Sequence, residues 1–125
     1  MIWSFKEDRP IHSQLIELIK LGIVSGEWKA GDKLPSVRDL AEEAGVNPNT
    51  MQRALADLEK EGLVYSKRTS GRFITEDNNM VDSIRKAIAA ENINNFIESM
   101  KKLGFTPEQT LEAFKTAVEG SEKNE

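Results

Sequence analysis

Two short amphipathic segments joined by a tight turn constrain this chain more than any other feature. Segment 37–44 follows Ser36, a residue type that caps helix N-termini, and ends at Gly45, which adopts a left-handed conformation without steric cost. Segment 48–61 follows a second cap, Asn47, and starts with proline, which is tolerated at the first helical position. Two helices joined by a glycine-containing turn of about four residues are typical of a helix-turn-helix.

The first turns of segment 48–61 offer polar side chains and no acidic one. Together with the cap, these side chains are Asn47, Asn49, Thr50, Gln52 and Arg53. Amides pair well with adenine, guanidinium groups with guanine, and helix N–H groups with phosphate. We therefore predict that this segment enters the major groove of DNA, with Asn49, Gln52 and Arg53 at base edges. From these residues alone, a capped surface helix in any small helical domain stays open as the alternative.

Composition excludes several classes of protein. The chain has 125 residues, no cysteine and a single histidine, His12, which we interpret as a core-edge or surface residue. It has no apolar run of about twenty residues and no signal peptide, so we expect a cytoplasmic protein without a membrane span. It also has no Gly-rich phosphate loop, nucleophile elbow or HExxH motif. We therefore predict no enzyme, no metal site and no cofactor.

The net charge of −4 is unevenly distributed along the chain. Residues 1–75 contain eleven Lys and Arg against eleven Asp and Glu, whereas residues 76–125 contain six against ten. Phosphate affinity depends on the local field at the contact surface, so an acidic tail does not exclude DNA binding. It predicts instead that the tail faces away from DNA.

The remaining pattern of residues 1–75 completes a small domain. An amphipathic helix is expected over 10–25, and after Gly62 the hydrophobic period changes to two, which predicts strands at 63–66 and 72–75. A hairpin directly after a helix-turn-helix is the wing of a winged helix. Its tip carries Lys67, Arg68, Ser70, Gly71 and Arg72, which we predict to contact the DNA backbone. A solvated turn is the alternative.

Residues 76–125 form the second predicted domain, a two-helix tail. One helix is expected from about Met80 to Leu103, and a second from Pro107, which follows a cap at Thr106. Two helices of this size cannot enclose a core, so their apolar face needs a partner. Packing against the chain's own first domain is one solution. A two-fold homodimer is the one we favour, because helix-turn-helix proteins read paired half-sites. Its predicted interface residues are Ile84, Ile88, Phe96, Met100, Leu111 and Phe114.

Three consecutive motifs give the chain a family resemblance. They are LPSVRDLA, GVNPNTMQRAL and LEKEGLVYSKRTSGRFI, all within residues 10–75, which resemble the DNA-binding domain of GntR-family bacterial regulators, in particular the YtrA subfamily. The resemblance implies a mainly α fold with a small β-hairpin: a winged helix-turn-helix followed by a short helical dimerisation region. By position, the resemblance implies DNA contacts at Arg38, Asn47, Asn49, Thr50, Gln52, Arg68, Ser70 and Gly71. The predicted DNA-contact set is completed by the cap Ser36 and by the basic residues Arg53, Lys67 and Arg72.

The resemblance also implies a biological role. YtrA-like regulators tend to repress transporter operons, so a dimeric repressor on an inverted-repeat operator is expected, and any small-molecule effector would bind at the dimer interface or between tail and winged helix. Pro48 and Gln52 stand where the family often has Arg, which predicts a different base preference. Thr69 stands where the wing usually has Gly. A winged helix used only for protein contact is the alternative function, and an acid-free helix start with a basic wing disfavours it.

Overall fold

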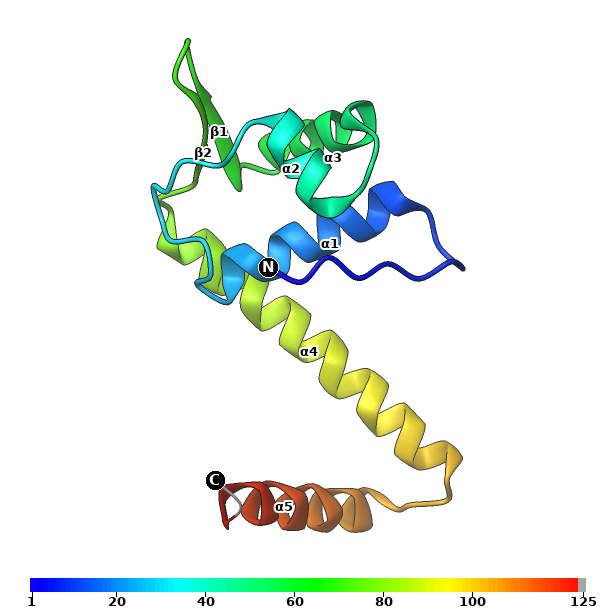
Figure 1. Cartoon of the computed structure of the whole chain (residues 1–125). Coiled ribbons are helices and arrows are strands. Elements are labelled where there is room, and N and C mark those ends of the chain that lie inside the picture. The colour runs from blue at the N-terminus through cyan, green and yellow to red at the C-terminus, as the bar shows by residue number, and fades with distance from the viewer. Residues whose placement is uncertain (124–125) are drawn as a thin grey trace. The chain divides into compact units, whose positions relative to one another are not determined.

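A computed structural model describes residues 1–123 of the chain. The chain divides into two compact units, the first being Met1–Arg85 and the second beginning at Lys86. The elements follow the order predicted, mostly helical with one two-stranded antiparallel hairpin (Figure 1). The first unit contains α1, α2, α3, β1, β2 and the beginning of α4, and the second contains the rest of α4 and α5. Their bounds are α1 Ile11–Val24, α2 Val37–Ala44, α3 Pro48–Lys60, β1 Val64–Lys67, β2 Gly71–Ile74, α4 Asn78–Lys102 and α5 Pro107–Lys123.

The core of the first unit lies where α3 packs against α1 and α2. The apolar residues spaced three and four apart in each helix face one another there, as amphipathic helices require. At one edge of the α1–α3 contact the half-buried His12 bonds Asp57 through Nε2 at 2.8 Å, which agrees with the core-edge interpretation. The buried cluster consists of Leu15, Ile19, Ile23, Leu34, Leu40, Ala41, Ala44, Met51, Ala54, Leu55, Leu58, Leu63, Val64 and Ile74.

A buried glutamine fixes the segment that precedes α1. The Gln14 amide accepts from the Lys6 N–H at 2.7 Å and donates to the carbonyls of Lys6 and Arg9 at 2.8 and 2.9 Å. Trp3 and Phe5 of the same segment pack against the core. The sequence patterns did not identify Gln14, because a polar residue on the apolar face of a helix signals neither a cap nor a turn.

The wing has a third strand-like edge. In the hairpin Val64 pairs with Ile74 and Tyr65 with Phe73, and the two aromatic rings stack with centroids 5.7 Å apart. The loop before α2 extends this ladder, since Lys33 bridges Phe73 and the Leu34 N–H donates to the Arg72 carbonyl at 2.9 Å. The wing is therefore anchored on both sides rather than only through its two connections.

The first turns of α4 belong to the winged helix. Met80, Val81 and Ile84 pack against its core, and Arg85 Nε donates to the Val24 carbonyl at the end of α1 at 2.8 Å. The first compact unit thus extends beyond residue 75, where the sequence pattern had set the boundary of the first domain. The change of hydrophobic period and the turn residues mark the end of the last strand. They do not show that the first apolar residues of the following helix pack, partly buried, against the preceding domain.

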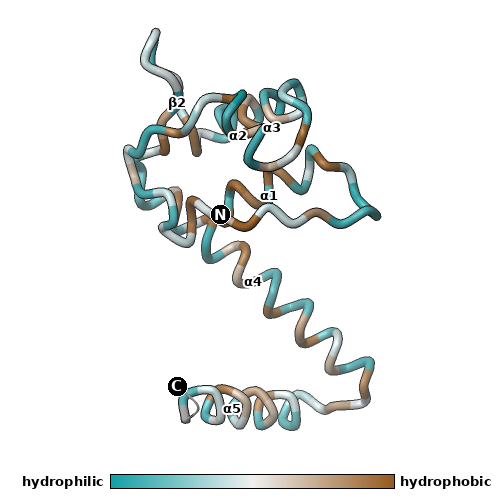
Figure 2. Tube along the Cα trace, in the orientation of Figure 1, coloured by the Kyte–Doolittle hydropathy of each residue, from teal (hydrophilic) through white to brown (hydrophobic). Residues whose placement is uncertain are grey.

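The second unit consists of residues 86–102 of α4 and the whole of α5. A complete capping box starts α5: the Gln109 N–H donates to Thr106 Oγ1 at 3.1 Å, and the Thr106 N–H donates to Gln109 Oε1 at 2.9 Å. None of the α4 side chains is buried, and the hydrophobic residues of α4 and α5 recur along helices whose other positions are hydrophilic (Figure 2). A unit built this way leaves most of its large apolar side chains exposed.

Candidate nucleic-acid interface

The N-caps of α2 and α3 form as the sequence predicts. Ser36 Oγ accepts from the Asp39 N–H at 3.1 Å at the start of α2, and Gly45 ends α2 in the left-handed conformation with φ 71°. The Asn47 side chain accepts from the Asn49 N–H at 2.8 Å at the start of α3. The side-chain oxygen of Asn47 is therefore already used as a cap, so only the side-chain NH₂ group of Asn47 is available for contact with DNA.

One face of α3 is polar and exposed. Met51, Leu55 and Leu58 turn into the core on one side of the helix, while Asn49 and Gln52 are exposed on the opposite side. Arg53, four residues after Asn49, extends this exposed face, because residues three and four apart are neighbours on a helix. The predicted contact Thr50 is half-buried at the margin of this face.

Cations without a carboxylate partner are found on the elements next to this face. Of the eleven Lys and Arg residues in 1–75, Arg9, Lys20 and Arg72 form salt bridges with carboxylates. The other eight have no carboxylate within 4.0 Å among residues 1–123, and six of the eight lie on α2, on α3, in the wing or, in the case of Lys33, beside the wing. These six are Lys33, Arg38, Arg53, Lys60, Lys67 and Arg68. Cations that are not neutralised internally can exchange their counterions for phosphates.

The wing tip is a tight turn with a strained residue. The Ser70 N–H donates to the Lys67 carbonyl at 3.1 Å, and Thr69 has a positive φ of 62°. A β-branched residue rarely adopts this conformation, because its Cβ clashes with the backbone. The threonine that the sequence places in a position usually held by glycine is therefore accommodated at a conformational cost. Arg68 and Ser70 are exposed at this tip.

Two of the predicted wing contacts already have partners within the protein. Arg72 is half-buried, and its Nε donates to Glu59 Oε1 at 3.0 Å, while the same carboxylate accepts from Ser66 Oγ. These hydrogen bonds, first that of Ser66 and then that of Arg72, hold the pKa of Glu59 below its ordinary value although its partial burial acts in the opposite direction. The Lys67 ammonium lies 4.8 Å from the centre of the Phe73 ring.

Lys33 is a residue that the sequence reasoning missed. The exposed Lys33 side chain passes Gly71, where an added Cβ would lie 3.3 Å from its Cε. A groove of about 650 Å³ separates the loop before α2 from the wing tip, and its polar lining includes Lys33, Ser36, Thr69, Ser70 and Arg72. The only signal in the sequence was the position of Lys33, just before the Leu-Pro-Ser that leads into α2.

The predicted dimerisation residues fall into two groups. Phe96, Met100, Leu111 and Phe114 lie in the second unit, with Phe96, Leu111 and Phe114 well exposed and the Phe96 and Phe114 rings 6.1 Å apart. Ile88 is half-buried. Ile84 packs against the core of the first unit, because it lies on the first turns of α4, and this contact sets it apart from the other five predicted residues.

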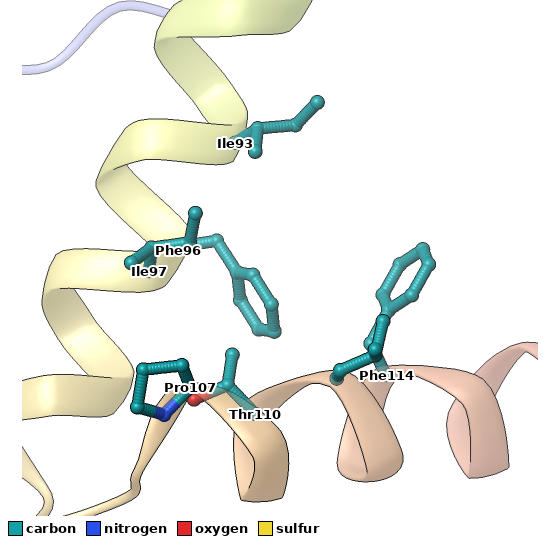
Figure 3. A pocket seen from close by; sticks show the side chains of 7 residues that line it. Ile93, Phe96, Ile97, Pro107, Thr110 and Phe114 are labelled. Carbon is teal, nitrogen blue, oxygen red and sulfur yellow. The ribbon is translucent and has the colours of Figure 1, made fainter.

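Between α4 and α5 lies an apolar groove of about 290 Å³. Figure 3 shows side chains of both helices along it, with the Phe96 ring directed toward α5. The following lining residues were not among the predicted interface residues: Ile93, Ile97, Pro107 and Thr110. Thr110 is the one polar residue of the lining, and its hydroxyl already donates to the Thr106 carbonyl at 2.9 Å.

Within residues 1–123 no helix is both long and apolar enough to cross a membrane. The same residues contain no group of three or more His, Cys, Asp or Glu side chains that could hold a metal ion.

The chain is similar to known proteins along most of its length. Residues 11–74 match the family described as bacterial regulatory proteins, gntR family. An uncharacterized HTH-type transcriptional regulator, YhcF of Bacillus subtilis, is 40% identical over 117 residues, covering 94% of this chain and 97% of that protein. The HTH-type transcriptional repressor YtrA of the same organism is 42% identical over 72 residues, 58% of this chain and 55% of that protein.

Solved structures agree in fold. A GntR family transcriptional regulator from Listeria monocytogenes superposes with a TM-score of 0.83 at 40% identity, covering 90% of this chain and 98% of that one. The DNA-binding domain of AraR, solved in complex with its operator ORX1, superposes with a TM-score of 0.53 at 28% identity, covering 58% of this chain and 93% of that one.

Proposed function

The chain belongs to the GntR family of bacterial regulatory proteins and is a DNA-binding regulator, and we propose that it reads DNA through the exposed face of α3 as a dimeric repressor on an inverted-repeat operator. One observation supports this most: the first turns of α3 expose polar side chains and no acid, and six cations without a carboxylate partner lie on α2, α3, the wing and the adjoining Lys33. Base edges and phosphates would then be contacted by adjacent groups of one rigid unit.

Asn49, Gln52 and Arg53 are the base-reading residues in this proposal. Their side chains provide amide and guanidinium groups on one helix face, matched to the donor and acceptor pattern of the major groove. The side-chain oxygen of Asn47 is used as a cap. Thr50 is half-buried, so we assign it with Arg38 to phosphate contact.

The wing side supplies the phosphate contacts. In this proposal, phosphates contact Lys67 and Arg68 of the wing and the hydroxyls of Ser36 and Ser70. We add Lys33, which lines the same groove as these two serines. The backbone of Gly71 allows a close approach to the same groove. Each cation that replaces a DNA counterion should contribute about 0.9 to the slope of log affinity against log salt concentration.

Substitutions in the full chain distinguish residues that read bases from residues that contact phosphates. Gln52→Ala should weaken binding to a selected operator by about 1–3 kcal/mol and leave binding to random DNA nearly unchanged. The combined change Lys67→Ala and Arg68→Ala should weaken binding to both DNAs and flatten the salt slope by about two, and Lys33→Ala by about one. Binding titrations at several salt concentrations measure both, with Asn94→Ala and Lys102→Ala on α4 as matched controls. An equal loss on operator and random DNA for Gln52→Ala would contradict its base-reading role.

For the second unit we propose a two-fold interface with another copy of this chain. The exposed apolar residues of α4 and α5 need a cover, and the groove between the two helices offers no free polar group that would orient a small molecule. Another copy of the same apolar surface fits such a lining better than an effector does. Half-sites related by the same two-fold axis would then lie roughly 34–36 Å apart on one face of the duplex.

A further inference from the structure

Glu59 is an acid on the DNA-reading helix that contacts both strands of the wing. It lies in the last turn of α3, where it accepts hydrogen bonds from Ser66 Oγ of β1 and from Arg72 Nε of β2, the latter at 3.0 Å. Among the described residues, no other side chain of α3 forms hydrogen bonds with the wing strands.

The two partners of Glu59 are themselves a cross-strand pair. Ser66 lies opposite Arg72 in the ladder, directly next to the Lys67–Gly71 pair that closes the turn. At the other end of the hairpin, Val64 and Ile74 are buried in the core. The backbone of Lys33 and Leu34 borders β2 on one side, at Phe73 and Arg72. On the side of α3, the Glu59 carboxylate supplies the hydrogen bonds that hold the exposed half of the wing, and a short hairpin depends on such contacts because it is marginally stable in water by itself.

We propose that Glu59 is a positioning residue for DNA binding, whose carboxylate holds the outer half of the wing against α3 so that Lys67 and Arg68 reach the DNA backbone. This inference rests on the phosphate-binding role proposed above for the wing. Arg72, in turn, acts mainly as a partner of Glu59 and not as a ligand of DNA.

The carboxylate is suited to this role at neutral pH. The hydrogen bonds from Ser66 and Arg72 keep the pKa of Glu59 below the ordinary value, so the group remains ionised and accepts both bonds. A glutamine would retain one acceptor oxygen but would lose the charge that strengthens the bond to the guanidinium.

The proposal makes a prediction opposite in sign to simple electrostatics. Removing a negative charge from a DNA-binding surface should strengthen attraction to phosphates. If the wing depends on Glu59, however, Glu59→Gln should bind a random-sequence duplex of about 30 base pairs roughly three- to tenfold more weakly, with a salt slope flattened by about one to two. Glu61→Gln is the matched control, since Glu61 ends the same helix but pairs with Lys20 of α1. This control should bind equally or more tightly.

A double substitution distinguishes positioning from direct contact. Lys67→Ala with Arg68→Ala should cost less in the Glu59→Gln background than in the wild type, and Arg72→Ala should add little to Glu59→Gln. Glu59→Asp and Ser66→Ala, each milder than Glu59→Gln, should give intermediate losses in a chain with an unchanged thermal midpoint.

The outcomes are separable. If Lys67→Ala with Arg68→Ala leaves wild-type binding and its salt slope unchanged, the proposed wing contact fails and this inference fails with it. If that change weakens binding but Glu59→Gln tightens it, or if the losses of Arg72→Ala and Glu59→Gln simply add, the wing contact holds and the positioning role of Glu59 is overturned.

Discussion

The two compact units of this chain differ in how far their apolar side chains are buried. In residues 1–85 one contiguous cluster of buried side chains joins three helices and the base of the wing. In α4 no side chain is buried, and on α5 Leu111 and Phe114 are 66% and 53% exposed. A surface of this kind marks an interaction site in soluble proteins. The difference teaches that the first unit determines its own geometry, whereas the second leaves apolar surface exposed, for which we propose a partner.

The comparison is tested most strongly by matched leucine substitutions. Leu58 is fully buried, so Leu58→Ala should lower the free energy of unfolding by about 2–5 kcal/mol at every protein concentration. Leu111→Ala should change it by less than about 0.5 kcal/mol in dilute protein, and by more only where the protein associates. Urea unfolding over a hundredfold range of concentration measures both. A large loss for Leu111→Ala at the lowest concentration would mean that the second unit has a core of its own.

A smaller effect is expected at the boundary between the units. A chain ending at Arg85 should fold as the intact first unit, whereas one ending at Thr75 loses the contacts of Met80, Val81 and Ile84. Partial burial of three apolar side chains is worth roughly 2–4 kcal/mol as an upper estimate. Thermal and urea unfolding of the two fragments should differ accordingly. Equal stability would restore the boundary at residue 75 and leave the first turns of α4 to the tail.

The smallest effect is expected for a single hydrogen bond at the same boundary. Arg85 Nε donates to the Val24 carbonyl, but the side chain is 53% exposed, so solvent weakens the interaction. Arg85→Ala should lower stability by about 1 kcal/mol or less. Lys102→Ala, on the same helix in the second unit, should have no measurable effect. A loss of unfolding free energy well above 2 kcal/mol would indicate that Arg85 contributes more to the attachment of the N-terminal turns of α4 than this one hydrogen bond explains.

Local sequence signals predicted the elements of the fold well. These signals lie within a few residues of the element that they start or end: the caps Ser36 and Asn47, the glycine at position 45 and the change of hydrophobic period after Gly62. The helices and the hairpin of the structure follow them. The helix-turn-helix, its wing and their family were therefore predictable.

Contacts between distant segments were not predictable in the same way. Nothing local indicates that Lys33 would join the wing, that Ile84 would turn back onto the first core, or that Arg72 would be engaged by Glu59. Each depends on where a separate element comes to lie. Base reading by Gln52, the dimer and the regulation of a transporter operon stay predictions.

The central claim is that the second unit is completed by another copy of the chain, and sedimentation of the full-length protein tests it most directly. Phe114→Glu places a charge in the exposed apolar surface of α5, and Leu21→Glu, at a side chain 48% exposed on α1, is its matched control. Wild type and Leu21→Glu should sediment as dimers of a 14.0 kDa chain, and Phe114→Glu as a folded monomer. A monomeric wild type, or a Phe114→Glu variant that dimerises as tightly as the wild type, would contradict the account.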